Sequence, residues 1–475
     1  MQGVSGAARP VLCVDLDGTL VRTDTLMESL LVLVRHRPWI VLALPWWMLR
    51  GRASFKARIA SLAPIDAATL PYDPDVVAFL RSEHAAGRTI VLATASHIDS
   101  ARRIAEHLEL FAGVHATDRV NCKSVEKANV LALAYGEGGF TYAGDSRADI
   151  AVWKRARAAI LVNASPRVRD ALGNVPIERE FPRRASRAAE LWRLLRPHQW
   201  AKNALLAVPL LTAHKYADSH AVVAAALAVL AMCATASAIY VVNDLLDLEA
   251  DRRHPVKHRR PFASGTVPLQ WAIPVIAVLA TASAFACVPL PRAFSLGLAS
   301  YAVAAVGYSL WVKHVAWLDA GWLACLYTLR IYLGALAIEV PISGWLLAFS
   351  FFAFGSLALM KRFTELTSLA YRHGVHHARA YHFDDRKFVE VVGWGSSLLA
   401  VAVLVLYLGS ETAGTLYRDP HLLWGAVPLI AYLLLASWWA AHEGRMHEDP
   451  VWYVIRKPGT YIVLGAVLGL MLAAR

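Results

Sequence analysis

Two aspartates separated by a single residue follow a short apolar run near the start of the chain. Asp15 and Asp17 occur in the segment DLDGT, and Gly18 permits a sharp turn directly behind them. A carboxylate is anionic at neutral pH, so Asp15 can attack phosphorus without help from a base. Asp17 can then protonate the leaving alcohol and later activate water. This pair predicts phosphoryl transfer through a phosphoryl-aspartate intermediate.

Polar residues farther along the chain have the side chains that such a reaction needs. Thr94 ends the apolar run 89–94 and offers a hydroxyl and backbone N–H groups to phosphoryl oxygens. Lys127 would neutralise charge between the nucleophile and the phosphate, with Lys123 as a nearby competitor for this role. Carboxylate oxygens are hard ligands suited to Mg2+. The candidate metal ligands of this group are Asp15, Asp17, Asp145 and Asp149.

A second polar group lies where a long apolar segment ends, in YVVNDLLDLEADRRHPVKHRRPFASG (240–265). Asn243, Asp247 and Asp251 are four residues apart, so they share one face of a helix. Oxygen ligands stacked in this way can hold Mg2+ against a diphosphate. Lys257 and Arg260 follow and suit phosphate oxygens. The alternative is a solvated acidic-then-basic loop, but acidic residues at the end of an apolar span are costly unless they are used.

Charged residues at other ends of apolar segments extend this second candidate site. One precedes the first apolar segment, three lie at helical spacing where a later segment ends, and two are adjacent in the loop that follows. We predict that they form a basic, phosphate-binding region together with the cations of the first segment. The predicted phosphate-binding residues are Lys202, Lys257, Arg260, Lys361, Arg362, Glu365, Asp384 and Asp385.

The elements that must position the first group alternate between strands and helices. The apolar, β-rich runs 11–16, 89–94, 140–144 and 158–163 are each followed by turn residues and helical sequence. This alternation predicts a parallel, doubly wound α/β sheet in a domain spanning residues 1–175, with ligands bound beyond the carboxyl ends of the strands. Residues 20–75 form an insertion that predicts a helical cap; contact of its tryptophans with a lipid surface is the less favoured interpretation. A basic linker (176–195) follows.

The remainder, 196–475, predicts an all-helical membrane bundle. Nine apolar segments approach the ~20 residues that span a bilayer; they lie near 203–214, 219–242, 269–290, 293–312, 315–338, 343–362, 389–409, 421–441 and 459–474. The chain is 57% hydrophobic and carries a net charge of +12. Its basic clusters lie in alternate loops, which favours a multi-pass protein of the bacterial inner membrane with a cytoplasmic N-terminal domain and excludes nucleic acid as the expected partner.

The motifs DLDGT, LATAS and GDSRAD, with Lys127 between the last two, resemble those of the haloacid dehalogenase superfamily of phosphatases over about residues 10–175. The resemblance implies Asp15 as nucleophile, Asp17 as acid/base, and Thr94 and Lys127 as phosphate-binding residues. The Asp-rich segment and RPHQWAKN (196–203) resemble the UbiA superfamily of intramembrane prenyltransferases over about 190–475 and imply a nine-helix bundle. The second DxxxD motif usual in that superfamily is missing from the sequence after the sixth span.

Within that superfamily, RPHQWAKN, the Asp-rich segment, KRFTEL and a late DPVW are similar to polyprenyl-phosphate phosphoribosyltransferases. The resemblance implies Mg2+-dependent transfer of 5-phosphoribose from phosphoribosyl diphosphate to a polyprenyl phosphate such as decaprenyl phosphate. The fused phosphatase would then remove the 5-phosphate. One alternative is prenyl transfer to an aromatic acceptor beside an independent phosphatase, and another is a degenerate N-terminal scaffold. A homo-oligomer remains possible.

Overall fold

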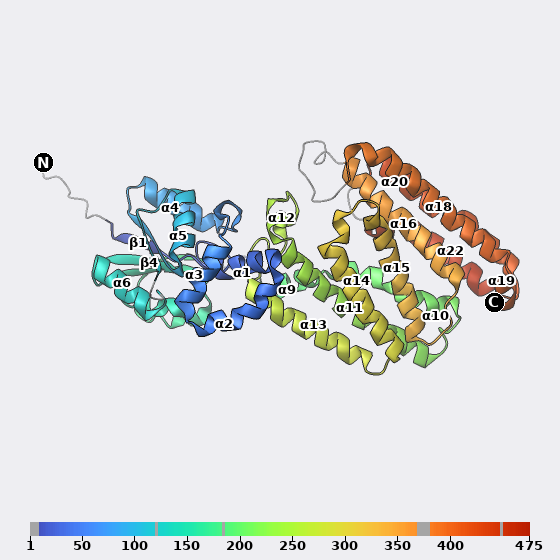
Figure 1. Cartoon of the computed structure of the whole chain (residues 1–475), viewed down its shortest axis with the longest axis horizontal. Coiled ribbons are helices and arrows are strands. Elements are labelled where there is room, and N and C mark those ends of the chain that lie inside the picture. The colour runs from blue at the N-terminus through green and yellow to red at the C-terminus, as the bar shows by residue number, and fades with distance from the viewer. Residues whose placement is uncertain (1–8, 119–121, 183–185, 368–380, 447–449) are drawn as a thin grey trace. The chain divides into compact units, whose positions relative to one another are not determined.

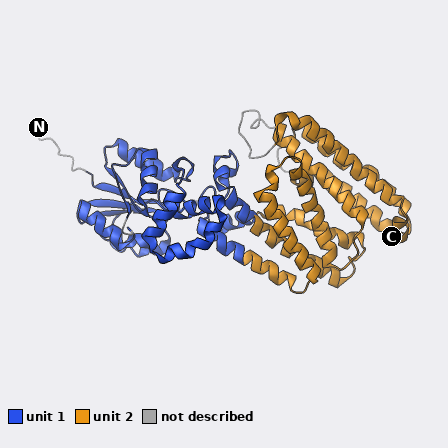
Figure 2. Ribbon diagram, viewed as in Figure 1, with its two compact units in different colours: residues 1–195, 240–277 blue, residues 196–239, 278–475 orange. Residues whose placement is uncertain are grey.

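The computed structural model describes residues 9–118, 122–182, 186–367, 381–446 and 450–475. The chain forms two compact units, which Figure 2 draws in different colours. Unit 1 comprises residues 1–195 and 240–277, and unit 2 comprises residues 196–239 and 278–475. The Asp-rich segment therefore belongs to the same unit as the N-terminal domain, a grouping that the sequence boundary at residue 196 did not predict.

Unit 1 is built on a parallel six-stranded sheet with the order β3-β2-β1-β4-β5-β6. Successive side chains point to opposite faces of a strand, so both faces must be covered when the runs are continuously apolar. Leu12 and Val14 join one buried cluster, and Cys13 joins the cluster on the other face. The strands are β1 (Val11–Val14), β2 (Ile90–His97), β3 (Gly113–Thr117), β4 (Phe140–Gly144), β5 (Ala158–Val162) and β6 (Ile177–Phe181).

Helices cover both faces of this sheet, which confirms the doubly wound α/β class. Side chains of α4 and α5 pack in one cluster and those of α6, α7 and α8 in the other, and Figure 1 shows α4 and α6 on opposite sides. Strand β6 extends the sheet past residue 175, into the segment that the sequence assigned to a linker. The helices are α4 (Pro74–Ala85), α5 (Ile98–Leu108), α6 (Val125–Tyr135), α7 (Ile150–Trp153) and α8 (Pro166–Asp170).

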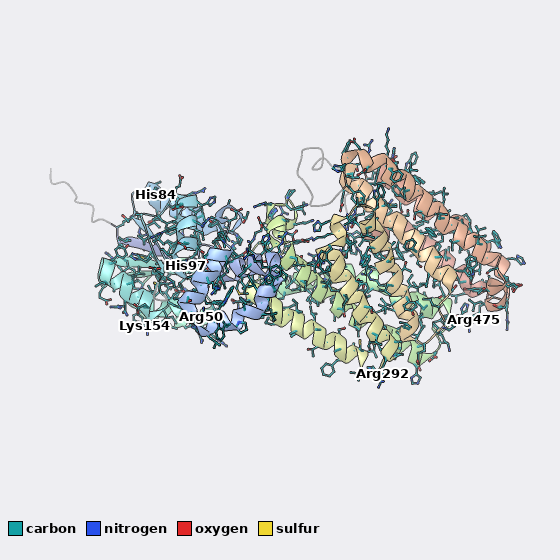
Figure 3. The ribbon with its side chains drawn as sticks, viewed as in Figure 1. Arg50, His84, His97, Lys154, Arg292 and Arg475 are labelled. Carbon is teal, nitrogen blue, oxygen red and sulfur yellow. The ribbon has the colours of Figure 1, made fainter. Side chains whose placement is uncertain are left out.

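The insertion after β1 is a helical cap, as predicted. Trp47 is buried against Leu33 and Ile59, whereas Trp39 and Trp46 are 66% and 61% exposed. Arg50, labelled in Figure 3, lies over the ring of Trp46. The cap therefore packs through one apolar face and leaves another in contact with solvent. Its elements are α1 (Thr25–His36), η1 (Pro38–Ala43), α2 (Leu44–Leu49), α3 (Arg52–Leu62) and η2 (Ala67–Thr69).

The Asp-rich segment packs against the cap through an apolar cluster of its own. Phe262 and Leu248 are buried there with Leu194, and Met27 and Leu31 of α1 lie against them. Burial of these side chains holds the end of α11 and the loop after it to the phosphatase half of unit 1. The elements involved are α9 (Arg187–Leu195), α11 (Ser219–Leu246), α12 (Leu248–Arg253), η5 (Lys257–Arg259), η6 (Leu269–Trp271) and α13 (Ala272–Cys287).

Unit 2 is entirely helical among its described residues. Within the part of the chain that the structure describes, seven helices are long and apolar enough to cross a membrane, and the bent pair α21 and α22, with 81° between its axes, would make an eighth. The first expected span, 203–214, instead forms the end of η4 and a five-residue helix α10, which has Pro209 in its first turn. The other elements are η4 (Pro197–Ala207), α10 (Val208–Thr212), α14 (Arg292–Leu310), η7 (Val312–His314), α15 (Leu318–Ala337), α16 (Gly344–Thr367), η8 (Phe383–Asp385), α18 (Arg386–Leu408), α19 (Glu411–Leu416), η9 (Pro420–Gly425), α20 (Ala426–His442), α21 (Pro450–Arg456) and α22 (Pro458–Ala473).

Candidate active sites

The carboxyl ends of the central strands of unit 1 surround a cavity of about 600 Å³. Asp15 and Asp17 follow β1, and Asp145 follows the neighbouring strand β4. The turn after β1 needs glycine, because Gly18 has a φ of +82° and a Cβ there would lie 2.5 Å from Asp145 Oδ2. The chain therefore brings two distant acidic motifs into van der Waals contact.

Three carboxylates form a group that could hold a metal ion. Oxygens of Asp15, Asp145 and Asp149 lie within 4.8 Å of one another. Burial, opposed by Lys127, raises the pKa of Asp15 to about 7, and burial together with the charge of Asp15 raises that of Asp145 to about 8. Crowded buried carboxylates are stabilised by a divalent cation with oxygen ligands, so this donor set fits Mg2+.

Lys127, not its competitor Lys123, contacts Asp15, the predicted nucleophile. Its Nζ lies 2.7 Å from Asp15 Oδ1 and 3.7 Å from Asp149 Oδ1. It also donates to the hydroxyl of Tyr142, which in turn donates to Asp149 at 2.9 Å. Sequence reasoning missed Tyr142, because an aromatic side chain in an apolar strand is typical of the core. This buried network fixes the position of the ammonium group beside the attacking oxygen.

Asp17 is oriented separately from the metal group. Its carboxylate accepts from the backbone N–H of Thr25 at 2.8 Å and from the Ser96 hydroxyl, and Thr25 and Ser96 are themselves hydrogen-bonded. Burial, followed by the charge of Asp24, raises the pKa of Asp17 to about 6. A carboxyl group that titrates near neutral pH suits acid/base work. Its side chain is not one of the three clustered carboxylates.

Thr94 lies within β2 and is fully buried. Its hydroxyl accepts the backbone N–H of Ser96 at 3.0 Å, whereas the cavity itself is lined by Ala95 and Ser96. A direct contact of the Thr94 side chain with phosphate therefore stays a prediction. Ser96 was missed because the motif LATAS was interpreted through its threonine; its serine reaches both the cavity and Asp17.

The Asp-rich segment retains helical spacing across the end of α11. Asp247 N–H donates to the Asn243 carbonyl at 2.9 Å, and Asp251 N–H donates to the Asp247 carbonyl at 2.8 Å. The side-chain oxygen of Asn243 is buried without a hydrogen-bond partner among the described residues. A buried unpartnered oxygen is costly and is the kind of atom that a cation would satisfy. The three predicted ligands thus lie on successive turns, and their donor atoms fit Mg2+.

Arg260 is held by carboxylates in this structure. Its Nη1 lies 2.5 Å from Asp251 Oδ2 and 3.3 Å from Asp244 Oδ1. Asp244 was missed because it falls outside the four-residue spacing, although it is 2% exposed. Lys257 begins the short helix η5 in the same segment. Binding of a substrate phosphate by Arg260 would require sharing its guanidinium with these two acids.

The predicted basic residues of unit 2 lie in two groups. Lys202 is buried in η4 with its Nζ 5.8 Å from the ring centroid of Tyr327. Arg330 packs against the same ring and donates to Asn203 at 3.2 Å and to the Tyr301 hydroxyl at 2.5 Å. This aromatic and cationic cluster was not predicted beyond Lys202, since it depends on α14 and α15 meeting η4.

The guanidinium group of Arg362 is hydrogen-bonded within a second network. It donates to both oxygens of Asp319, to Glu365 and to Tyr308. Its exposure is 1%, so its charge is balanced by these neighbours and not by solvent. A direct phosphate contact from Arg362 or Glu365 stays a prediction.

The last three predicted phosphate-binding residues lie around η8 and the end of α16. Lys361 is half-buried on α16. Asp385 accepts the backbone N–H of His382 at 2.7 Å, which caps η8, and Asp384 is exposed beside it. The structure gives Asp385 a local structural role. Asp449, the first residue of the DPVW motif, lies outside the described residues.

Comparison with known proteins assigns both halves of the chain. Residues 204–457 match the model of the UbiA prenyltransferase family. The chain belongs to this family. Residues 12–154 match the haloacid dehalogenase-like hydrolases, and this range contains strands β2 to β4, most of β1 and the carboxylate cluster described above. The chain is therefore a multi-pass membrane enzyme in which a UbiA domain is fused to a haloacid dehalogenase-like domain.

Three relatives illustrate the range of the UbiA match. The chain is 32% identical to "Uncharacterized protein y4nM" of Sinorhizobium fredii, over 97% of this chain and 89% of the relative. It is 35% identical to "Nodulation protein NoeC" of Azorhizobium caulinodans, over 58% of this chain and 90% of the relative. It is 36% identical to "Decaprenyl-phosphate phosphoribosyltransferase" of Mycolicibacterium smegmatis, over 46% of this chain and 68% of the relative.

Replacing Lys127 with Gln should reduce the phosphatase kcat of the haloacid dehalogenase-like domain by about 100-fold or more, because a preorganised charge beside the nucleophile is lost. The measurement is hydrolysis of p-nitrophenyl phosphate by the purified full-length protein. Lys123→Gln is the matched control, since Lys123 lines the same cavity without an ion pair to Asp15. A larger loss in Lys123→Gln than in Lys127→Gln would reverse the assignment of the two lysines.

Mg2+ affinity at the haloacid dehalogenase-like site should rise between pH 6 and pH 8. Cation binding requires ionised carboxylates, and the pKa values of Asp15 and Asp145 are raised by burial to about 7 and about 8. Each displaced proton contributes up to about a tenfold change in affinity per pH unit. Calorimetric titration of the Asp247→Ala variant in two buffers would measure this site and its proton release. Equal affinities at pH 6 and pH 8 would contradict the expected linkage.

Proposed function

We propose that the UbiA domain transfers 5-phosphoribose from phosphoribosyl diphosphate to a polyprenyl phosphate, and that the other domain removes the 5-phosphate. The observation that carries this proposal is the similarity to decaprenyl-phosphate phosphoribosyltransferases, combined with three oxygen donors on successive helical turns. The product would be polyprenyl-phosphoryl ribose, a precursor of sugar donors for cell-wall synthesis. Polyprenyl phosphate, phosphoribosyl diphosphate and the membrane are the partners proposed.

In the transfer step, the bond between C1 of ribose and the diphosphate oxygen breaks, and its electron pair leaves with diphosphate. An anionic oxygen of the polyprenyl phosphate forms the new bond to C1. This nucleophile is already ionised, so no general base is required. Asn243, Asp247 and Asp251 would hold Mg2+, which supplies charge stabilisation to a leaving diphosphate when bound. Lys202, Lys257, Arg260 and Lys361 would bind phosphate oxygens.

In the hydrolytic step, Asp15 Oδ attacks phosphorus and the bond from phosphorus to O5 of ribose breaks. Asp17 gives its proton to O5, so the sugar leaves as an alcohol. Asp17 then takes a proton from the water that attacks the phosphoryl-aspartate, and inorganic phosphate is released with Asp15 restored. Lys127 stabilises negative charge beside the nucleophile. Asp15, Asp145 and Asp149 would hold Mg2+, which would neutralise phosphoryl oxygens.

The alternative activity is transfer of a prenyl group from prenyl diphosphate to an aromatic acceptor, in keeping with the name of the matched family. A scaffold role for the N-terminal domain is opposed by its complete carboxylate and lysine network. The decisive test gives detergent-solubilised enzyme Mg2+, labelled phosphoribosyl diphosphate and decaprenyl phosphate. We expect label in an extracted lipid. Labelling only from prenyl diphosphate, with an aromatic acid as acceptor, would reject the proposal in favour of the alternative.

We also propose that the enzyme lies in the bacterial inner membrane with its haloacid dehalogenase-like domain in the cytoplasm. The basis is the excess of Lys and Arg in alternate loops. The segments that contain Asp247 and Lys361 should then be cytoplasmic, and Arg475 should be outside. Accessibility of single introduced cysteines to a membrane-impermeant reagent measures this topology. Residues 251 and 420 on the same side of the membrane would reject the arrangement.

A further inference from the structure

A loop from the UbiA half of the sequence lines the phosphatase cavity. This motif loop, residues 261–270, comprises the end of the Asp-rich segment and the residues after it, between η5 and α13. Gly265, Thr266, Pro268 and Gln270 face the same 600 Å³ space as Asp15. All of these residues belong to unit 1. The hydrolytic cavity is therefore completed by residues outside the region that matches the hydrolase family.

A buried ion pair ties the motif loop to the cap. Arg252 donates to the two oxygens of Glu28 at 3.0 and 2.6 Å, and its Nε donates to the carbonyl of Ala263 at 3.2 Å. The side chains of Arg252 and Glu28 are 7% and 6% exposed. Thr23 donates to the same Glu28 at 2.6 Å. A bidentate, desolvated pair of this kind fixes orientation, because neither charge can find water as a substitute.

Close backbone packing leaves the motif loop no room to shift. Gly265 has a φ of +70°, and a Cβ there would lie 2.5 Å from Arg22 Cβ and 2.6 Å from the Arg22 carbonyl oxygen. Thr266 donates to Glu190 at 2.8 Å on the other side. Arg22 is itself paired with Asp73 at 3.0 Å. The loop is thus held against the strand-end turns that carry Asp15 and Asp17.

We propose that the motif loop is a substrate-selecting wall of the phosphatase cavity, built to receive a sugar phosphate that is linked to a polyprenyl phosphate. This inference rests on the proposed function and adds the residues that recognise its hydrolytic substrate. A small phosphomonoester needs only the carboxylates and Lys127. A lipid-linked sugar phosphate is longer and carries a second, diester phosphate, and the cavity is lined by cations besides Lys127. Those cations are Arg22, Lys56, Lys123 and Arg187.

The test compares two substrates in full-length protein reconstituted in lipid nanodiscs. One is p-nitrophenyl phosphate, and the other is decaprenyl-phosphoryl ribose 5-phosphate. Gly265→Ala should reduce kcat/KM for the lipid substrate by about tenfold or more, because the displaced wall no longer fits it, and should change kcat/KM for the small ester by less than about threefold. Gly173→Ala is the matched control: its φ is +60°, but nothing lies within 4 Å of its added Cβ.

A second variant keeps the test independent of loop packing. Gln270 is exposed at the cavity, so Gln270→Ala removes a contact without disturbing the core. It should raise KM for the lipid substrate by about three- to tenfold and leave its kcat and the small-ester reaction unchanged. Equal losses on both substrates, or no loss in either variant, would overturn the selecting role while leaving the proposed function intact. Wild-type hydrolysis of the small ester alone would overturn the proposed function and this inference with it.

Discussion

Replacing Asp15 with Asn should abolish hydrolysis and cause the chain to accumulate polyprenyl-phosphoryl ribose 5-phosphate. The amide has nearly the volume of the carboxylate, but it cannot form the phosphoryl-enzyme intermediate. We expect phosphatase kcat to fall by roughly 10⁴-fold or more, as for removal of other enzymatic nucleophiles. Transfer to the lipid should continue, because the Asp-rich segment is a separate site. Mass spectrometry of extracted lipids measures the outcome, since the two products differ by one phosphate.

The control for this experiment is Asp75→Asn, an equivalent change at an aspartate that lines the same cavity but lies outside the carboxylate cluster. It should yield the dephosphorylated lipid, as wild type does. Identical lipid products from Asp15→Asn and wild type would show that the phosphatase serves another substrate. The connection between the two reactions would then be rejected, although each reaction could still occur.

Replacing Asp247 with Ala should abolish transfer to the lipid while leaving hydrolysis of p-nitrophenyl phosphate intact. Loss of one ligand from a metal that stabilises the leaving diphosphate removes several kcal/mol of transition-state stabilisation. A loss of about 4 kcal/mol corresponds to roughly a 10³-fold fall in rate. The assay is incorporation of labelled phosphoribosyl diphosphate into decaprenyl phosphate by solubilised enzyme.

Glu249→Ala is the matched control for Asp247, because it removes an acid two residues away that pairs with Arg253 at 2.8 Å. Residues two apart do not share a helix face, so Glu249 is off the line formed by the predicted ligands. Transfer should survive in this variant. If Asp247→Ala lost both transfer and hydrolysis while the protein remained folded, the assignment of two separate sites would be wrong.

The sheet and the acidic residues at its strand ends could be predicted because both depend on local pattern. Four strands are short apolar runs, and acidic residues follow two of them. Strand β6 (IEREF) escaped prediction because it is an exposed edge strand with charged side chains and no apolar run. The contacts of Ser96 and Tyr142 depend on strands that are far apart in sequence. The residue types therefore indicated the chemistry of the site, whereas the contacts between those residues could be identified only from the three-dimensional structure.

In the membrane half, too, the sequence predicted the helices but not the contacts between their side chains. The length of the apolar runs predicted the long helices, because such a run can be recognised from consecutive residues alone. It did not predict that Arg362, interpreted as a phosphate ligand, would be satisfied by Asp319 of another helix. Nor did four-residue spacing reveal Asp244, which shares Arg260 with Asp251. Pairs separated by many residues leave no periodic signal in a single sequence.

The packing of the cap against the Asp-rich segment limits where this gene could be split into two. A protein fragment ending at residue 195 would keep every catalytic aspartate of the phosphatase. It would also leave Glu28 without Arg252, the partner in its ion pair. The apolar side chains of Met27, Leu31 and Leu194 would lose their cover and face water. Gene fission at the linker would therefore expose these apolar side chains on the hydrolase fragment and favour its aggregation.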